Sequence, residues 1–461
     1  MAALDGPSSG PVVVVLPITT QDEQLGQTTL AFGLHEDICG ALTRFRNLKV
    51  IAPRSAAAAA DGDDIALRAR FGATHALHAR LQSDDGTLRL TATLVDCETL
   101  QQVWHERFEV VADDIVRLEL EVVGRIATTL NTRLEEALLY QSRRRPPKSL
   151  AAYELTLCGL RRLRGGTLAD DEAARALFER ALELDPQFAR AHSAIALSWF
   201  NEWSCQFWDR YEEASRKAYV HAHEALSLDD SDSMVNLVIA KTMLFRRQHE
   251  HAAWYLDRAL ALCPNDAELL AQASLLEVYL GRAMAGVAHL ERAMRLNPLH
   301  PNYDFSLGTI AHWYAGDFDG ALAMHRASDA QPFVDTPAFA AALLTEAGLQ
   351  DEAETQLQAF FASYGEKIVP GRRPLPGEAS AWLERVNPFR RPEDAERLLR
   401  PLTLRNSPAR VTAAEAPTPA KTGLLERTAL GWHATFDGLS LDLPDLKGLQ
   451  DIERLLQQPG C

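Results

Sequence analysis

The sequence lacks several features that mark particular classes of protein. No stretch approaches the roughly eighteen consecutive apolar residues that a membrane-spanning helix needs, so no span is expected. The six cysteines are widely scattered and form no C-x-x-C pair, which argues against a zinc site or a disulfide framework and favours reduced thiols. Walker A, G-x-G-x-x-G and H-E-x-x-H motifs are missing too, so neither a phosphate cradle nor a zinc protease is predicted.

Positive charge is also in short supply. The 461 residues carry 47 Lys and Arg against 63 Asp and Glu, a formal net charge of −16. Nucleic-acid binding depends on clustered positive charge, and anionic membrane surfaces attract basic proteins. We therefore expect neither nucleic acid nor a membrane among the partners. The first ten residues hold no Lys or Arg ahead of a short apolar run, so they do not resemble a signal peptide and a cytoplasmic protein is expected.

What the sequence does contain is an internal repeat. A pattern of Ala, an apolar residue and Leu, usually followed by Pro, recurs at Ala181, Ala225, Ala259, Ala293 and, in worn form, Ala327. From Ala225 onwards the copies are 34 residues apart. Each Pro stops a helix, because it has no N–H and its ring clashes with the preceding turn. These regular breaks exclude a continuous coiled coil and predict paired amphipathic helices.

The period resembles the tetratricopeptide repeat (TPR), a helix pair of about 34 residues. One pair cannot bury its apolar face alone, so pairs must stack into a solenoid. We predict about six pairs over residues 150–365, with the first and last irregular. Small residues occupy the positions where paired helices approach closely: Ala196, Ala240, Ser274 and Gly308 in first helices, and Ala252, Gly286 and Gly320 in second helices.

One repeat is longer than the others. The step from Ala181 to Ala225 is 44 residues. The additional stretch is rich in aromatic residues, which either cap the groove of the solenoid or fill its core. They are Trp199, Phe200, Trp203, Phe207, Trp208 and Tyr211.

The residues ahead of the repeat follow a different pattern. An apolar strand at 11–18, a helix at 25–45, a strand at 48–52 and a helix at 63–71 precede a β-meander and a closing helix at 115–134. Asp85-Gly86 marks the hairpin turn of the meander. Residues 11–140 are therefore predicted to form an α/β domain with a mixed sheet, in the order βαβα, meander, helix. One meander strand alternates buried and polar positions, with Leu88, Leu90, Ala92 and Leu94 facing inward.

The remaining segments are short. Residues 1–10 are predicted to be a disordered tail, 141–149 a basic linker, and 406–423 a disordered linker poor in large apolar groups. Residues 366–405 are expected to form an irregular capping segment with a short helix. The last segment, 424–461, alternates around Phe436-Asp437-Gly438 and then turns helical, which predicts a small hairpin-helix unit.

The first domain and the repeats together resemble a known bacterial arrangement. The matching residues are Val14-Val15-Leu16-Pro17, Phe32-Gly33-Leu34-His35-Glu36-Asp37-Ile38, Leu90-Thr91-Ala92-Thr93-Leu94-Val95-Asp96, Val103-Trp104 and Asn387-Pro388-Phe389. They are similar to the TolB-amino-terminal-like domain that precedes TPRs in bacterial class III adenylate cyclases and OmpR-type regulators. In that family the cyclase or winged helix lies ahead of this module. Only ten residues precede it here, so the resemblance implies a regulatory or partner-binding role.

The last forty residues carry a second resemblance. Residues 424–461 look like a short module of bacterial ATPase-type regulators, and also like the opening hairpin and first helix of a winged-helix domain, that is, an incomplete winged helix. The chain stops where a recognition helix would begin, and such a helix is what reads base edges. DNA binding is therefore not expected.

No constellation of residues points to catalysis. A G-x-S-x-G match at 6–10 lies ahead of the first strand instead of on a strand-to-helix elbow. His75 and His78 fall on opposite faces of a strand. His221 and His223 do not share a helix face. We therefore expect no catalytic residues, no metal and no cofactor.

The groove of the solenoid is the surface for which the sequence favours partner binding. First helices line it, and aromatic residues in such a groove are typical anchors for a peptide. Ordinary packing between repeats is the alternative for each residue. The TPR register places eight residues in or near the groove: Lys241, Leu244, Phe245, Val278, Tyr279, Phe305, His312 and Trp313.

These observations lead to two hypotheses. The first is a non-enzymatic regulatory or scaffold protein that binds a protein or peptide partner through the groove, with signal sensing by the α/β domain. The alternative is the regulatory part of an adenylate cyclase-like signalling system, or of a transcription regulator, whose output domain is absent from this chain. The oligomeric state is left open.

Overall fold

The computed structural model of the chain separates into two compact units, Met1–Thr403 and Leu404–Cys461. The first unit holds an α/β domain and a helical solenoid, and the second holds a small sheet. The residues that the structure describes are 11–20, 25–45, 48–60, 63–84, 87–111, 122–123, 150–163, 165, 167–205, 210–328, 333–405, 424–428, 431–436 and 439–443.

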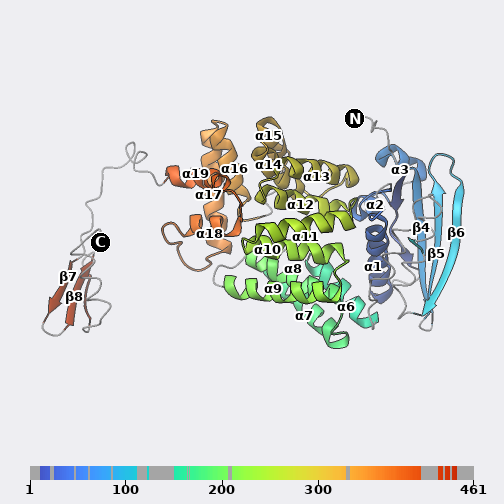
Figure 1. The fold of residues 1–461 in the computed structure, drawn as a ribbon, viewed down its shortest axis with the longest axis horizontal. Helices are drawn as coiled ribbons and strands as arrows, with labels where there is room; N and C mark the ends of the chain where they lie inside the picture. Colours follow the sequence, from blue (N-terminus) through green and yellow to red (C-terminus); the bar gives the residue numbers. More distant parts are fainter. Residues whose placement is uncertain are drawn as a thin grey trace. The chain divides into compact units, whose positions relative to one another are not determined.

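The N-terminal domain is built on a six-stranded sheet in the order β3-β1-β4-β5-β6, with β2 paired to β4. β1 runs parallel to β3 and β4, whereas β4, β5 and β6 form an antiparallel meander, so the sheet is mixed as predicted. β6 is the outermost strand of the meander (Figure 1). The strands are β1 (Val12–Val15), β2 (Thr19–Thr20), β3 (Lys49–Val50), β4 (His75–Asp84), β5 (Thr87–Asp96) and β6 (Gln102–Val111).

Three helices accompany this sheet: α1 (Leu25–Leu42), α2 (Pro53–Ala57) and α3 (Asp64–Phe71). β1 is apolar at every position because both of its faces are buried. Val13 and Val15 lie in the core that contains α1, and Val12 and Val14 in the core that contains α2 and α3. The predicted alternation along β5 is confirmed, since every second residue from Leu88 to Leu94 is buried.

Local signals explain where α3 begins and ends. The Asp63 carboxylate accepts a hydrogen bond from the Ala66 N–H at 2.8 Å, and Gly72 closes the helix with a φ of 65°. The short helix α2 was not predicted. Of the predicted closing helix at 115–134, only 122–123 lie within the described residues, where they are helical and buried in the α1 core.

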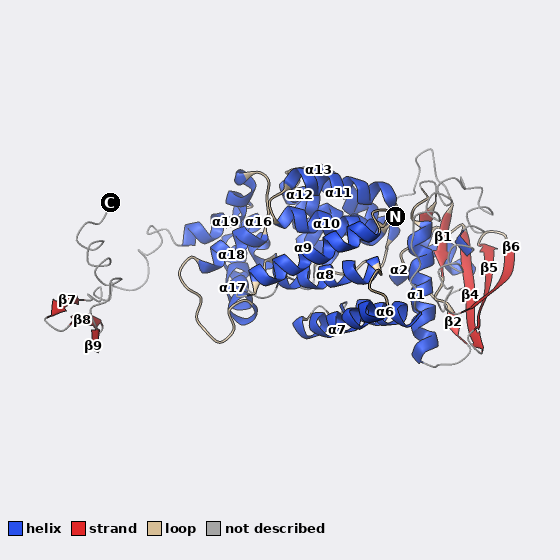
Figure 2. Ribbon diagram, turned by 60° about the horizontal axis from the view of Figure 1, so that its bottom comes forward, coloured by secondary structure: helices blue, strands red, loops and turns tan. Residues whose placement is uncertain are grey.

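Six helix pairs follow in the described part of the chain, which confirms the TPR-type solenoid (Figure 2). In the last four pairs, short turns within the described residues join the two helices, and successive pairs stack. The pairs are α6 (Leu150–Leu163) with α7 (Leu168–Leu184), α8 (Ala189–Cys205) with α9 (Tyr211–Leu228), α10 (Ser233–Phe245) with α11 (His249–Leu262), α12 (Ala267–Tyr279) with α13 (Ala283–Leu296), α14 (Tyr303–Tyr314) with α15 (Phe318–Ala327), and α16 (Thr336–Glu346) with α17 (Gln350–Lys367).

Small residues set the spacing within the pairs, as predicted. A Cβ on Gly286 would lie 2.7 Å from the Ser274 carbonyl oxygen, and one on Gly308 would lie 3.0 Å from the Met324 side chain. Both distances are shorter than van der Waals contact, so the helices approach as closely as their backbones allow.

The aromatic residues of the long second pair fill the core. Trp199, Phe200, Trp203 and Tyr211 are all buried. The Phe200 and Trp203 rings lie 4.8 Å and 5.4 Å from the ring of Phe245 on the next pair. Phe207 and Trp208 lie outside the described residues.

Residues 366–405 are more regular than predicted, because two helices occupy most of this segment. They are α18 (Glu378–Val386) and α19 (Pro392–Arg405). Trp382 and Leu383 on α18 are buried in the solenoid core, and the Trp382 ring lies 5.5 Å from that of Tyr364 on α17. The expectation of an irregular segment with one short helix was therefore wrong, since the segment continues the helical core.

The α/β domain packs on turns that precede first helices of the solenoid, with α1 and α2 between the sheet and the repeats (Figures 1 and 2). The Asn265 side-chain amide donates to the carbonyl oxygens of Phe45 and Leu48, both at 2.8 Å. The Ala52 N–H donates to the Leu296 carbonyl at 2.9 Å. These buried contacts join the two domains into one compact unit.

The second unit contains a three-stranded antiparallel sheet in its described residues. Its strands are β7 (Leu424–Thr428), β8 (Gly431–Phe436) and β9 (Leu439–Leu443), in the order β7-β8-β9. The predicted hairpin is formed by β8 and β9. Its turn at 437–438 and the predicted helix that follows lie outside the described residues.

Candidate partner-binding face

First helices of successive pairs lie side by side and form one surface, the first-helix face, made of α8, α10, α12, α14 and α16. The eight residues predicted from the TPR register come from three of these helices. They are Lys241, Leu244 and Phe245 on α10, Val278 and Tyr279 on α12, and Phe305, His312 and Trp313 on α14.

Most of these eight side chains are buried. Leu244, Val278, Tyr279, His312 and Trp313 all belong to the buried class. Lys241, Phe245 and Phe305 are half-buried, so only these three keep part of their surface open. Partner binding by the eight residues stays a prediction.

The aromatic end of the face is covered by the chain's own segment 387–391. The Phe389 ring lies between two aromatic side chains, 5.0 Å from the ring of Tyr279 and 5.0 Å from that of Tyr314. The Tyr279 hydroxyl donates to Asn387 Oδ1 at 2.6 Å. Tyr279 is thus in contact with residues more than a hundred positions further along the chain.

Main-chain groups of this segment are held as well. The Arg247 guanidinium donates to the Glu384 carbonyl at 2.7 Å and to the Phe389 carbonyl at 3.4 Å. His249 Nε2 donates to the Pro388 carbonyl at 3.0 Å. The Arg390 N–H donates to the Tyr279 carbonyl at 2.8 Å.

Arg247 has an unusual backbone conformation. Its φ is 62°, in the left-handed region that costs a non-glycine residue free energy. At the equivalent turn of the next three pairs the chain has Gly281, Gly316 and Gly348, all with positive φ. An arginine therefore stands where glycine fits better, and its side chain is one of those that hold the covering segment.

Ion pairs also connect this segment and helix α19 to the solenoid. Arg390 pairs with Glu250, and Arg397 pairs with Glu346 at 2.8 Å. The same Glu346 carboxylate accepts the Trp313 indole N–H at 2.9 Å. Arg397 also lies 4.8 Å above the Trp313 ring, so Trp313 is enclosed by the chain itself.

The other half of the face is more open. Lys241 donates through Nζ to Gln272 Oε1, and its ammonium lies 5.4 Å from the Phe200 ring. The half-buried Phe305 ring lies 4.9 Å from that of His300. A cation, an amide group and a half-buried aromatic ring are therefore found on this half of the face.

A buried carboxyl group, that of Asp304, directly precedes Phe305 on α14. Asp304 is 2% exposed, and its Oδ1 accepts no hydrogen bond from any described residue. Burial, assisted by the charge of Glu268, raises the pKa of Asp304 to about 7. Glu268 itself accepts a hydrogen bond from the Tyr303 hydroxyl at 2.7 Å.

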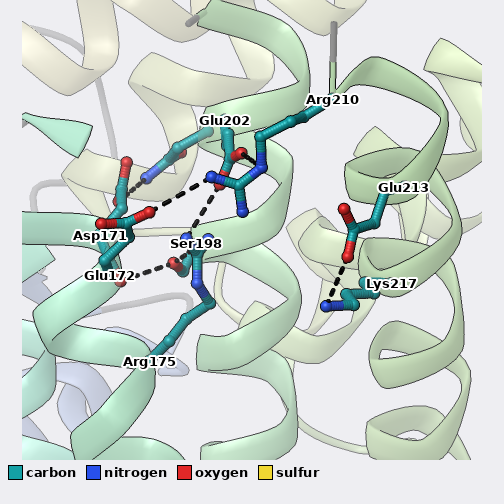
Figure 3. Close-up of polar contacts among 9 residues, drawn as sticks. Asp171, Glu172, Arg175, Ser198, Glu202, Arg210, Glu213 and Lys217 are labelled. Atoms are coloured by element: carbon teal, nitrogen blue, oxygen red, sulfur yellow. Dashed lines mark hydrogen bonds and ion pairs between the residues drawn. The ribbon is translucent and has the colours of Figure 1, made fainter. Parts of the chain in front are cut away.

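A second buried polar group, which sequence reasoning missed, lies between α7, α8 and the start of α9 (Figure 3). Glu202 is paired through Oε2 with Arg175 at 2.9 Å and through Oε1 with Arg210 at 2.9 Å. Arg175 also donates to Ser198 and stacks 3.8 Å from the Trp199 ring centroid. Because guanidinium groups pair with both carboxylate oxygens, Glu202 connects α7 and α8 with the start of α9.

The histidine pairs considered in the sequence are engaged in other contacts. His78 pairs with Asp64 at 2.8 Å, and His75 Nδ1 lies 2.9 Å from the Thr74 hydroxyl. His221 Nδ1 lies 3.2 Å from His192 Nδ1, and burial lowers the pKa of His221 to about 4. Among the described residues, no three His, Cys, Asp or Glu side chains are grouped to hold a metal ion. No helix in the same part of the chain is long and apolar enough to cross a membrane.

Comparison with known proteins gives limited matches. No protein-family model matches the chain. A curated relative from Rhizobium meliloti (strain 1021), named "Putative adenylate cyclase 3", is 26% identical over 248 residues, which cover 52% of this chain and 42% of that protein. The chain therefore spans less than half the length of this relative.

Several solved structures are similar to part of the chain. PilF from Pseudomonas aeruginosa is 19% identical, with a TM-score of 0.33, over 45% of this chain and 90% of that one. A thermophilic TPR protein from Thermus thermophilus is 20% identical, with a TM-score of 0.33, over 45% and 98%. PilW, a type IV pilus biogenesis factor, is 21% identical, with a TM-score of 0.35, over 47% and 95%. These low scores do not define a shared architecture, and none of the matches shows a TolB-like first domain.

Proposed function

We propose that this chain is a non-enzymatic, cytoplasmic regulatory or scaffold protein whose solenoid binds a protein or peptide partner through the groove lined by its first helices. The α/β domain, which resembles a TolB-amino-terminal-like domain, is proposed to sense a signal that regulates this binding. Nucleic acid is not proposed as the partner, because the net charge is −16.

One observation carries the proposal: beside this face, Tyr279 and the turn between α10 and α11 already contact main chain of the protein's own residues 384–390. Arg247, His249 and the Tyr279 carbonyl together make four hydrogen bonds with main-chain groups of residues 384–390. Side chains that reach main-chain carbonyls recognise an extended segment whatever its sequence, and aromatic contacts such as those of Phe389 with Tyr279 and Tyr314 add selectivity.

The residues proposed to contact a partner directly are the half-buried ones, Lys241, Phe245 and Phe305. Lys241 would supply a cation, and the two rings would supply apolar contact. The other five predicted residues are buried and would shape the groove from beneath. They are Leu244, Val278, Tyr279, His312 and Trp313.

Site-specific photo-crosslinking tests the proposal in the full chain. A photoreactive amino acid is placed at Phe305 or, as a matched control, at Trp254, which is 54% exposed on the second helix α11. We expect one partner to be captured from Phe305 and not from Trp254, and Lys241→Glu to abolish that capture. Equal capture at both positions would contradict a groove site.

The similarity to an adenylate cyclase favours a second candidate, the regulatory part of a cyclase-like signalling system. Both candidates share a non-catalytic chain. Purified full-length protein incubated with ATP and Mg²⁺ is therefore expected to form no cAMP. Steady cAMP formation that copurifies with the chain would overturn the non-enzymatic assignment.

A further inference from the structure

Strand β6 forms an edge of the sheet in the α/β domain. It is ten residues long, and among the described residues it pairs only with β5. An edge strand of this length presents main-chain N–H and C=O groups to which another strand can add. Natural proteins usually block such an edge with charge, so the charges on β6 decide what can pair with it.

The exposed face of β6 carries one charge of each sign near the middle of the strand. Successive side chains alternate, so that Arg107 and Glu109 point to the solvent face while Phe108 points to the core. Arg107 and Glu109 are each about half exposed, at 54% and 50%, and they form an ion pair within the strand at 3.1 Å, so the charges of a partner strand would add to an existing pair. Val111, at the end of the strand, is 63% exposed.

This charge order is complementary to itself under a two-fold axis. When two β6 strands run antiparallel with Phe108 opposite Phe108, Arg107 of each strand lies opposite Glu109 of the other. Residues directly opposite each other on one face interact, and unlike charges stabilise the pair. The neighbouring alignment, centred on Arg107, would place two arginines opposite each other and is disfavoured for the same reason.

We propose that the β6 edge is a dimerisation surface on which a second copy of the chain adds its own β6 in antiparallel orientation, with Arg107 opposite Glu109 twice. A second copy is favoured over an unrelated strand because β6 itself carries the complementary charges, and self-pairing covers the edges of both chains at once. The surface is separate from the first-helix face, so this inference does not depend on the proposed function.

Sedimentation equilibrium of the full chain tests the dimer. We expect wild-type protein to dimerise with a Kd of roughly 1–100 µM, since a single strand edge is a small interface. Arg107→Glu sets like charges opposite each other twice, and we expect it to weaken dimerisation roughly tenfold or more. Arg80→Glu is the matched control. It makes the same charge change on β4, two strands inward and in register with Arg107 through Thr91, and should leave the dimer unchanged.

Mixing two variants gives a second, independent readout. Arg107→Glu and Glu109→Arg should each dimerise roughly tenfold or more weakly than wild type, while their equimolar mixture should form a heterodimer with both charge pairs restored. The double variant Arg107→Glu/Glu109→Arg should dimerise again, which the Arg107-centred alignment does not allow. Circular dichroism reports whether Glu109→Arg folds, because Glu109 also pairs with Arg89 at 2.7 Å on β5.

Three results would overturn the proposal. The first is a wild-type chain that stays monomeric at about 100 µM, the upper end of the expected Kd range. The second is an equal effect of Arg107→Glu and Arg80→Glu. The third is a mixture of folded Arg107→Glu and Glu109→Arg chains that remains monomeric. If Glu109→Arg does not fold, the dimerisation constants of Arg107→Glu and Arg80→Glu still test the proposal.

Discussion

Replacing Gly286 with Ala should push helices α12 and α13 apart. A Cβ at this position would lie 2.7 Å from the Ser274 carbonyl oxygen and 3.5 Å from Val278 Cγ2. Ordinary contact begins at about 3.4 Å, so one helix has to move by roughly 0.7 Å. The obstacle is backbone within a helix, which cannot rotate away as a flexible side chain could.

The expected loss follows from two opposing terms. Overpacking of this kind costs about 1–3 kcal/mol, whereas Gly→Ala inside a helix gains up to about 1 kcal/mol. Gly365→Ala on α17 is the matched control, because no described atom lies within 4 Å of its Cβ position. We expect urea unfolding to give Gly365→Ala a free energy of unfolding equal to or above wild type. The value for Gly286→Ala should lie about 1–3 kcal/mol below that of the control.

Equal free energies of unfolding for Gly286→Ala and Gly365→Ala would contradict this expectation, because the contact between α12 and α13 would then be looser than the structure indicates. A larger residue sharpens the comparison, and Gly286→Val should lose more stability than Gly286→Ala. A loss in Gly286→Val that matches Gly365→Val would mean that β-branching, and not the close approach to Ser274, is responsible.

Three further predictions concern buried polar groups. Glu202→Gln removes the charge that pairs with Arg175 inside the core, and is expected to lower the free energy of unfolding in urea by about 3 kcal/mol or more. Asp304→Asn should stabilise the fold increasingly from pH 5 to pH 8. The folded pKa of this carboxyl is raised to about 7, so its ionisation in the folded state costs free energy that grows with pH, by roughly 2–3 kcal/mol over that range, as melting curves at both pH values would show. Asn265→Ala removes the side-chain donor of the Leu48 carbonyl and one of the two donors of the Phe45 carbonyl, which keeps its hydrogen bond from the Leu48 N–H, and should raise amide hydrogen exchange at Phe45 and Leu48 while exchange within β5 is unchanged.

The repeat could be predicted from the sequence because its signals are local. Most copies have a Pro just after the second helix, such as Pro264 or Pro298, so the 34-residue spacing marks most pair boundaries directly. The same holds for α3, because the residues at its two ends, Asp63 and Gly72, are themselves the signals that start and stop the helix. The buried face of β5 follows from simple alternation.

The helix α18 was missed although its pattern was present. Ala379, Trp382, Leu383 and Val386 are spaced three and four residues apart, which is typical of a buried helix face. The preceding stretch at 370–376 is rich in Pro and Arg, and it led to the expectation of an irregular segment. For this segment, the periodicity of the apolar residues predicts the structure better than the composition of the neighbouring residues does.

The candidate site was predictable only in part, for a different reason. The TPR register identifies which side chains belong to the first-helix face, because that depends on position within one repeat. Whether Tyr279 is open or covered depends on Asn387 and Phe389, which arrive from a distant part of the chain. The network around Glu202 is likewise assembled from three helices. No pattern within one repeat carries such information.

The chain itself limits the length of peptide that the proposed groove can accept. At the start of the first helices the α/β domain occupies the turns, through contacts such as that of Asn265 with Phe45. At their ends the segment 387–391 fills the aromatic sites. A partner peptide is thus confined to a band across the middle of α8, α10, α12 and α14. With neighbouring helices about 9 Å apart, that band is roughly 27 Å long, and an extended peptide covers it with about eight residues. We therefore expect binding affinity to rise as a partner peptide is lengthened to about eight residues and to change little beyond that length.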